Sequence, residues 1–186
     1  MLNNNSIGIL STGHYLPDQH VSNQDFVSRG LDTSDEWISS RSGIKTRFIA
    51  AEDETTSDLA CKSAQHALDN GSITLDQIDF IIVATATADH NGFPSTACLV
   101  QQKLGCTREI PAFDISAACS GFAYALSIGQ SYIASGMATH GLIIGAETLS
   151  SIVDWSDRST CVLFGDGAGA AIIGPVSNQG IIGVNQ

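Results

Sequence analysis

Short, continuously apolar segments alternate along this chain with segments of helical periodicity. The plainest apolar segment runs from Phe80 to Thr85, and a helix without a single charge is expected from Ser120 to Ser135. Strands that are apolar on both sides are typical of parallel sheets whose two faces are covered by helices. The sequence therefore predicts an α/β fold with a mixed, mainly parallel sheet between helices.

The limits of the other elements follow from similar patterns. The segment from Thr56 to Asn70 is apolar on one face, which predicts an amphipathic surface helix. Pro94 suits the first position of a helix running to Leu104, and Thr33 and Glu36 have capping-box spacing at another helix start. No low-complexity linker interrupts the alternation, so no internal domain boundary is predicted. Strands are predicted at 7–15, 80–85, 112–115, 142–145, 161–164, 169–173 and 181–184.

Composition limits the partners and the class of protein. Nineteen acidic residues against eight Lys and Arg give a formal charge of −11, which argues against nucleic acid or an anionic membrane as a partner. With 186 residues, 43% of them hydrophobic, the chain can form the core of one domain or of a large half of a two-lobed enzyme.

The cysteines and the first residues indicate the compartment. The five cysteines are odd in number and show no C-x-x-C spacing, so neither a zinc site nor a disulfide framework is predicted; they are at 61, 98, 106, 119 and 161. The N-terminus has no basic or apolar leader pattern, and no run is long enough to span a membrane. We expect a soluble, cytoplasmic protein with reduced thiols and no bound metal.

Cys119 is the strongest candidate for a catalytic residue. It stands where a predicted strand passes into the charge-free helix, and the N–H groups and positive dipole end of a helix favour a thiolate there. Small neighbours, among them Ala118 and Gly121, leave room for a substrate carbonyl. Because the helix is apolar on every side, both it and the thiol are expected to be buried. The alternative is a structural thiol.

The segment from Gly165 to Gly169 could suggest a dinucleotide-binding loop. A phosphate-binding glycine loop must open a helix, whereas these glycines precede Ala170 to Ile173, which reads as a strand. A tight turn between two core strands is predicted instead.

The segment from Pro111 to Leu126 resembles the active-site block of β-ketoacyl-acyl-carrier-protein (ACP) synthase III, the thiolase-fold enzyme that starts bacterial fatty acid synthesis. Together, this block and others in the same order cover nearly the whole chain. The resemblance implies one half of a duplicated α-β-α-β-α architecture, with a buried central helix starting at Cys119. The further blocks are Thr33 to Ile38, Arg41 to Ile44, Phe93 to Cys98, Asp157-Arg158 and Phe164 to Ala170.

The resemblance also implies roles for single residues. Trp37, Arg41 and Arg158 fall on positions that contact the adenine and phosphates of coenzyme A in relatives, and Thr33 belongs to the same site. Spacing alone says only that Trp37 and Arg41 share a helix face, as a Trp packed on its own helix also would. Phe93 falls on a residue that crosses a twofold interface and lines the neighbour's acyl pocket.

The implied activity is an acyltransferase reaction that joins a short acyl-CoA, with acetyl-CoA as the expected primer, to malonyl-ACP through an acyl-Cys119 intermediate. Coenzyme A enters as a substrate thioester, no cofactor is tightly bound, and a homodimer is expected. Family members are roughly twice as long, and their second half supplies a catalytic His and Asn. This chain's histidines, at 14, 20, 66, 90 and 140, match no such segment.

We therefore expect residues 1–186 to be an N-terminal, cysteine-bearing half that is inactive in condensation by itself. Two alternatives belong to other classes. The chain could be a catalytically silent homologue that serves as a binding partner, or a thiol acyltransferase or hydrolase that stops after acyl transfer.

Overall fold

A five-stranded mixed sheet forms the centre of the molecule. The computed structural model describes residues 6–177, 180 and 181. The strand order is β1-β7-β6-β4-β5, and four of the strands run in one direction, because only β7 is antiparallel to its neighbours. The mainly parallel sheet is therefore confirmed. The strands are β1 (Ser6–Tyr15), β4 (Phe80–Ala84), β5 (Ala112–Ile115), β6 (Gly141–Thr148) and β7 (Asp166–Val176).

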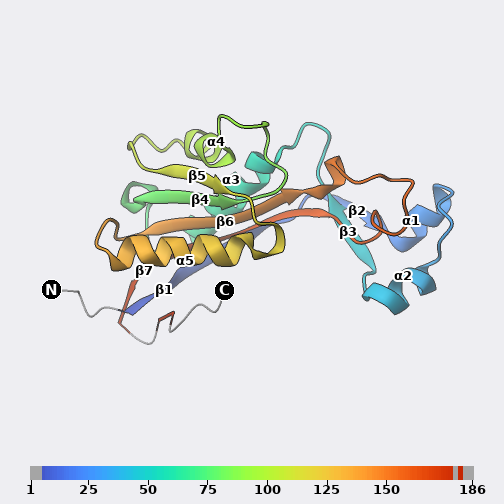
Figure 1. The fold of residues 1–186 in the computed structure, drawn as a ribbon, viewed down its shortest axis with the longest axis horizontal. Coiled ribbons are helices and arrows are strands. Elements are labelled where there is room, and N and C mark those ends of the chain that lie inside the picture. The colour runs from blue at the N-terminus through green and yellow to red at the C-terminus, as the bar shows by residue number, and fades with distance from the viewer. Residues whose placement is uncertain (1–5, 178–179, 182–186) are drawn as a thin grey trace.

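Helices cover the two faces of this sheet (Figure 1). The helices α3 (Thr56–Asn70) and α4 (Thr96–Lys103) pack on one face, and α5 (Gly121–Ala134) packs on the other. Alternate residues of β4 serve the two sides: Ile81 and Val83 face α3 and α4, while Ile82 faces α5. Every residue of β4 is buried, which explains its continuous apolar sequence.

A small lobe lies beyond the carboxyl ends of β4, β5 and β6, which point toward it in Figure 1. We define it as β2 (Gln19–Ser22), α1 (Asn23–Ser28), α2 (Asp35–Ser42), β3 (Thr46–Ile49) and the irregular segment 149–164. β2 and β3 form an antiparallel pair. Its core contains buried side chains from β2, α1, α2 and the segment 149–164, and Ile49 of β3 packs against them; the buried residues are Val21, Phe26, Ile38, Cys161 and Val162.

Arg47 joins the parts of the small lobe. Its guanidinium is buried, lies 4.7 Å from the ring centroid of Phe26, and donates to Asn23 Oδ1 at 2.8 Å and to the carbonyl of Val162. Burial lowers the pKa of Arg47. A buried cation needs such acceptors, and they connect α1 and β3 to a segment more than 100 residues later.

Most predicted elements are confirmed. The helix from Thr56 to Asn70 matches α3 residue for residue, and the strands predicted at 7–15, 80–85, 112–115, 142–145 and 169–173 fall on β1, β4, β5, β6 and β7. Helix starts were less well predicted. The cap of α2 is Ser34, whose Oγ accepts from Trp37 N–H at 3.0 Å, and α4 begins after its cap Ser95.

Two predictions near residue 165 are wrong. Residues 161–163 form turns and residue 164 has no regular structure, because Cys161 and Val162 are apolar for packing in the small lobe instead of in a strand. Residues 166–169 belong to β7, so they are no turn between strands. Gly165 has a packing role, since a Cβ there would lie 2.9 Å from both Arg47 Cβ and the Phe48 carbonyl. Ile181 lies outside any strand, and 182–184 fall outside the described residues.

The hairpin β2–β3 and the helix α1 were missed. The signal for α1 was available, because Ser22 and Asp25 form a capping box with both reciprocal hydrogen bonds. Among the described residues, no helix combines the length and apolarity that crossing a bilayer requires.

Close packing of β1 against α3 gives the first prediction. A Cβ on Gly13 would overlap the backbone nitrogen of Ala67 and the carbonyl oxygen of Ser63, and neither backbone atom can move without shifting the helix. We expect Gly13→Ala to lower the free energy of unfolding by about 1 to 3 kcal/mol, measured by urea denaturation. Gly169→Ala is the matched control, since nothing lies within 4 Å of its Cβ. Equal midpoints for the two variants would contradict this packing.

Candidate active site

Cys119 lies in a sharp turn between β5 and α5. Residues Ala118–Ser120 form a single 3₁₀ turn, and α5 begins at Gly121. Ala118 has φ of 45° and is the one non-glycine residue with positive φ in the described part of the chain. Such a conformation costs of order 1 to 3 kcal/mol and persists where the surroundings hold it. The turn therefore presents a cysteine under backbone strain, as functional sites often do.

Contacts with the neighbouring strands hold this turn. A Cβ on Gly121 would stand 3.1 Å from Ala84 Cβ, so glycine lets the start of α5 approach the end of β4 closely. On the other side of β5, the Asp114 carboxylate accepts from Thr96 N–H at 2.7 Å and Ala97 N–H at 2.8 Å. The acid thus fixes the start of α4 beside the strand that leads to Cys119.

The expected burial of Cys119 is wrong for this chain, because the thiol is exposed. The helix after it is covered on its sheet side alone, where Gly121, Ala125 and Gly129 are buried. On its outer side Phe122 is 37% exposed and Tyr124 is 36% exposed. No other described element covers that side, so the apolar outer face of α5 remains uncovered.

The other cysteines differ in accessibility. Cys161 is buried and Cys61 is partly buried, and burial raises the pKa of both thiols. Cys106 is also partly buried. Cys98 is exposed, and its sulfur lies 3.6 Å from the carbonyl oxygen of Ala112. Exposure therefore leaves Cys98 and Cys119 as the thiols most accessible to a reagent, and only Cys119 precedes a long helix.

Three residues expected around coenzyme A lie together on the small lobe. The guanidinium carbons of Arg41 and Arg158 are 4.5 Å and 5.1 Å from the ring centroid of Trp37. Arg158 Nη1 also donates to the side chain of Asp32 at 3.0 Å and to its carbonyl. An aromatic ring beside two exposed guanidinium groups suits a ligand that has both a flat base and phosphates.

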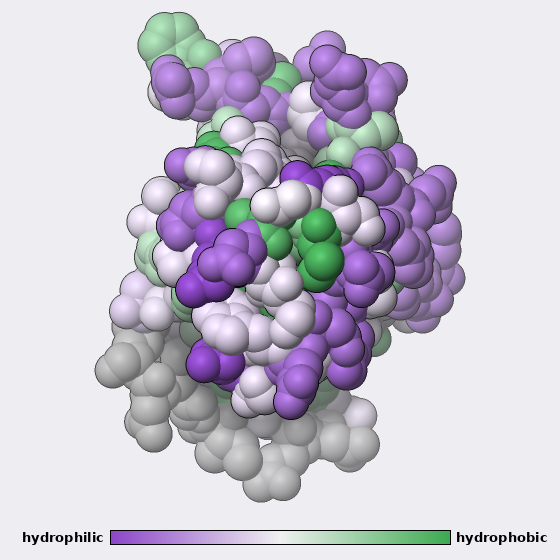
Figure 2. Space-filling model, turned by 90° about the vertical axis from the view of Figure 1, so that its right-hand side faces the viewer, coloured by the Kyte–Doolittle hydropathy of each residue, from purple (hydrophilic) through white to green (hydrophobic). Residues whose placement is uncertain are grey.

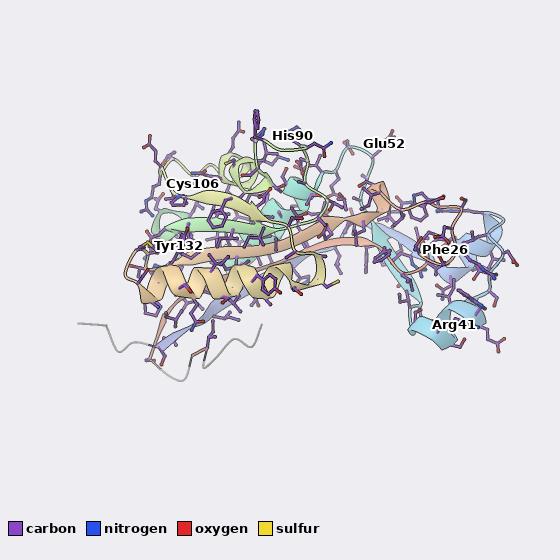
Figure 3. All side chains as sticks on the ribbon, in the orientation of Figure 1. Phe26, Arg41, Glu52, His90, Cys106 and Tyr132 are labelled. Atoms are coloured by element: carbon purple, nitrogen blue, oxygen red, sulfur yellow. The ribbon has the colours of Figure 1, made fainter. Side chains whose placement is uncertain are left out.

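Thr33, the fourth residue expected at this site, follows Asp32 in the chain. Its hydroxyl is buried and has no hydrogen-bond partner among the described atoms. Buried hydroxyls nearly always have a partner, so this one is an exception, and it follows Asp32, the residue to which Arg158 donates. Figure 3 shows Arg41 at the outer edge of the lobe and Phe26 inside it. Figure 2 views the molecule from this end, where small hydrophobic areas are surrounded by polar side chains.

A cavity of about 640 Å³ opens between the sheet and the loops, and sequence analysis missed it. It is lined by parts of the segments 50–56, 86–92 and 148–152. Beside it the Glu147 carboxylate accepts from Ala86 N–H at 2.8 Å and Thr87 Oγ1 at 2.5 Å. The sequence did contain a signal for this site, because Glu147 is an acid near the end of the mostly apolar strand β6.

Phe93, the predicted pocket and interface residue, extends from the loop between β4 and α4. It is 91% exposed, the highest exposure among the large hydrophobic residues described. Its ring therefore has little packing within this chain. Among residues 6–177, 180 and 181, no group of three or more His, Cys, Asp or Glu side chains is arranged to hold a metal ion.

The geometry predicts which thiol reacts first. We expect iodoacetamide to modify Cys119 faster than any other cysteine of the folded chain, because it is exposed at the start of α5. Peptide mass spectrometry over time measures this, and Cys98→Ala is the matched control because it removes the other exposed thiol. Faster modification of Cys61, Cys98, Cys106 or Cys161 would contradict the assignment.

Comparison with known proteins agrees with the fold and the motifs. Residues 113–186 match the family model for 3-oxoacyl-[acyl-carrier-protein (ACP)] synthase III. The beta-ketoacyl-[acyl-carrier-protein] synthase III of Neisseria meningitidis serogroup C is 59% identical over 174 residues, which are 94% of this chain and 54% of that protein. The chain spans about half the length of the curated relatives it matches.

Solved structures give the same result. The crystal structure of 3-oxoacyl-[acyl-carrier-protein] synthase III from Aquifex aeolicus VF5 is 51% identical, with a TM-score of 0.87 over 92% of this chain and 55% of that one. A priming β-ketosynthase of the R1128 polyketide pathway is 35% identical, with a TM-score of 0.88 over 94% of this chain and 52% of that one. The fold is thus thiolase-like. Over its matched residues, this chain belongs to the β-ketoacyl-ACP synthase III family and corresponds to the N-terminal part of its members.

Proposed function

We propose that this chain is the cysteine-bearing half of a cytoplasmic β-ketoacyl-ACP synthase III. The reaction condenses a short acyl-CoA, with acetyl-CoA as the first candidate, with malonyl-ACP to start fatty acid synthesis. The observation that carries the proposal is the exposed thiol of Cys119 in a strained turn at the start of α5. Neither half-reaction needs a metal or a tightly bound cofactor.

In the first half-reaction the Cys119 thiolate attacks the carbonyl carbon of the acyl thioester. The backbone N–H groups at the start of α5 stabilise the negative charge that develops on the carbonyl oxygen. The bond between that carbon and the sulfur of coenzyme A then breaks, and coenzyme A leaves as a thiolate that takes up a proton. The product is an acyl thioester on Cys119.

The small lobe holds coenzyme A during this step. The adenine stacks on the Trp37 ring, and the guanidinium groups of Arg41 and Arg158 neutralise phosphates. The unpaired hydroxyl of Thr33 supplies a hydrogen bond to the base. The carboxyl ends of β4, β5 and β6 point toward this lobe, so the thioester end of the ligand can extend toward Cys119.

In the second half-reaction malonyl-ACP loses carbon dioxide, and the resulting carbanion equivalent attacks the acyl carbon on Cys119. The bond from that carbon to sulfur breaks and returns the thiolate. A His and an Asn from a C-terminal half stabilise the enolate. The uncovered outer face of α5, with Phe122 and Tyr124 at its surface, is where that half packs.

A homodimer through this half is also part of the proposal. β5 is an edge strand with one neighbour among the described strands, so its outer side is free for a second copy. The start of α4 and the loop that carries Phe93 lie next to this edge, because Asp114 of β5 binds Thr96 and Ala97. Phe93 then reaches into the acyl pocket of the partner subunit and limits the size of the primer.

The coenzyme A site yields a binding prediction. We expect Trp37→Ala and Arg158→Ala each to weaken coenzyme A binding by about 1 to 3 kcal/mol, because each removes a stacked or charge-assisted contact. Calorimetric titration measures this on the chain completed with the C-terminal half of the Neisseria meningitidis relative. Arg29→Ala, which removes the same charge without a contact to Trp37, is the control. Unchanged affinity in both variants would rule out this site.

The uncovered face of α5 yields a prediction about the chain alone. Apolar burial stabilises by roughly 25 cal/mol per Å², and a bare apolar face of several hundred Å² is unusual for a monomer. We expect residues 1–186 alone to self-associate or bind a hydrophobic dye, and to form no acetoacetyl product with malonyl thioester. Light scattering and a condensation assay test this. A monodisperse monomer that condenses unaided would refute the half-enzyme assignment.

The two alternatives are separated by the covalent intermediate. Mass spectrometry after incubation with acetyl-CoA, with and without the C-terminal half, reports whether Cys119 carries an acetyl group. An adduct that condenses only when the half is present supports the synthase. An adduct that is hydrolysed or transferred under both conditions identifies an acyltransferase or hydrolase. No adduct under either condition identifies a silent binding partner.

A further inference from the structure

The loop that carries Phe93 is held at its ends and free in its middle. Residues 90–94 are exposed, and Figure 3 shows His90 pointing away from the body of the molecule. Because the Phe93 ring is 91% exposed, packing within the chain does not fix its direction. That direction is set by the backbone on either side of the exposed residues. We call residues 88–94 the Phe93 arm.

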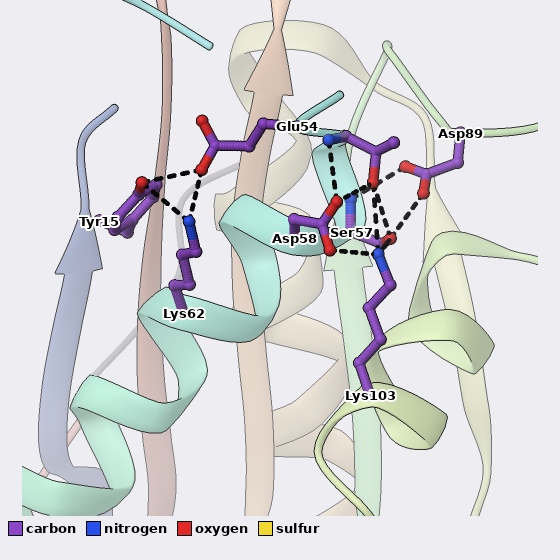
Figure 4. Close-up of polar contacts among 8 residues, drawn as sticks. Tyr15, Glu54, Ser57, Asp58, Lys62, Asp89 and Lys103 are labelled. Carbon is purple, nitrogen blue, oxygen red and sulfur yellow. Dashed lines mark hydrogen bonds and ion pairs between the residues drawn. The ribbon is translucent and has the colours of Figure 1, made fainter. Parts of the chain in front are cut away.

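Asp89 anchors the first end of the arm to α3. Its Oδ1 accepts from Ser57 N–H at 2.9 Å, and its Oδ2 accepts from Ser57 Oγ at 2.5 Å (Figure 4). Ser57 is fully buried in the first turn of α3, where a free N–H and the positive end of the helix favour a carboxylate. The two bonds fix both the position and the plane of the carboxylate.

Lys103 from α4 completes this anchor. Its Nζ donates to Ser57 Oγ at 2.7 Å and to Asp58 Oδ1 at 2.5 Å. Since Lys103 donates to the Ser57 hydroxyl, the hydroxyl proton is directed to Asp89. Burial alone raises the pKa of Asp58, but the bonds from Lys103 and Thr55 lower it on balance. The anchor therefore joins α3, α4 and the Phe93 arm through charged groups.

The second end of the arm is fixed independently. The side chain of Ser95 caps α4 by accepting from Cys98 N–H, and Asp114 accepts from Thr96 and Ala97. Between the anchors, Gly92 has φ of 111°, a conformation that a residue with a side chain rarely adopts. Removing the Asp89 anchor thus frees one end of a short exposed segment and leaves the buried Ser57 N–H without this acceptor.

We propose that Asp89 is a positioning residue that acts through Ser57 and Lys103 to fix the direction of Phe93, and that it thereby determines acyl-chain selectivity. This inference rests on the proposed function, in which Phe93 limits the primer accepted by the neighbouring subunit. With the anchor broken, the phenyl group no longer closes the pocket at a constant depth, and longer primers are accepted.

The first test measures the arm itself and needs no activity. Hydrogen–deuterium exchange of the peptide covering residues 86–95 is followed in Asp89→Ala and Lys103→Met. Asp89→Ala is expected to speed exchange by roughly tenfold, as loss of a charge-assisted hydrogen bond would. Lys62→Met is the matched control. It breaks the neighbouring network of Lys62 with Tyr15 and Glu54, which does not touch the arm (Figure 4).

The second test measures selectivity in the chain completed with its C-terminal half. The readout is kcat/KM for butyryl-CoA divided by kcat/KM for acetyl-CoA. Asp89→Ala and Phe93→Ala are each expected to raise this ratio about tenfold, the order expected for a change in a hydrophobic pocket. The double variant Asp89→Ala/Phe93→Ala is expected to have the same ratio as Phe93→Ala alone, because Asp89 acts through the Phe93 side chain. Asp89→Asn, which keeps one acceptor oxygen, restores part of the selectivity.

The outcomes distinguish this inference from the proposed function. Unchanged exchange in Asp89→Ala overturns the anchor. A ratio that responds to Phe93→Ala but not to Asp89→Ala overturns the positioning role while the proposed function stands. A ratio that does not respond to Phe93→Ala overturns the role of Phe93 in the proposed function, and the selectivity claim with it. An additive double variant shows that Asp89 acts by another route and also overturns the inference.

Discussion

Burial of the central strands on both faces is the constraint on which the rest of this structure depends. The side chains of β4 and most of those of β6 are enclosed between α3 and α4 on one side and α5 on the other. Polar and reactive groups therefore have no place along the middle of the sheet and gather where strands end. Cys119 just beyond β5 and Glu147 near the end of β6 are both consequences of this exclusion.

Carboxylates organise that edge of the sheet by accepting hydrogen bonds from backbone N–H groups of loops. Asp89 binds the start of α3, Asp114 binds the start of α4, and Asp166 binds Ala50 and Ser150. A carboxylate offers several acceptor sites at once, so one side chain can hold two segments that are distant in sequence. Some of the acidic residues that give the chain its net negative charge therefore have a structural role.

The helix α5 connects the fold with the proposed chemistry. The buried residues of α5, which face the sheet, are glycine and alanine. Their small size lets the strained turn at Ala118 and Cys119 lie close to the end of β4. Its outer side has apolar residues with no cover among the described elements. A second half packed there would bury those residues and enclose Cys119. This agrees with the proposal that two halves form one catalytic site.

Sequence alone determined the layered architecture, because the spacing of apolar residues along β4 and α3 reflects which faces of each element are buried. It also determined the motifs around Cys119, Trp37 and Phe93, which carried the resemblance. Tertiary structure alone decided that Cys161 and Val162 pack in the small lobe instead of the sheet, since apolarity does not specify the burying partner. It alone decided the Arg47, Asp89 and Glu147 bonds, because they join residues far apart in sequence and leave no periodic signal.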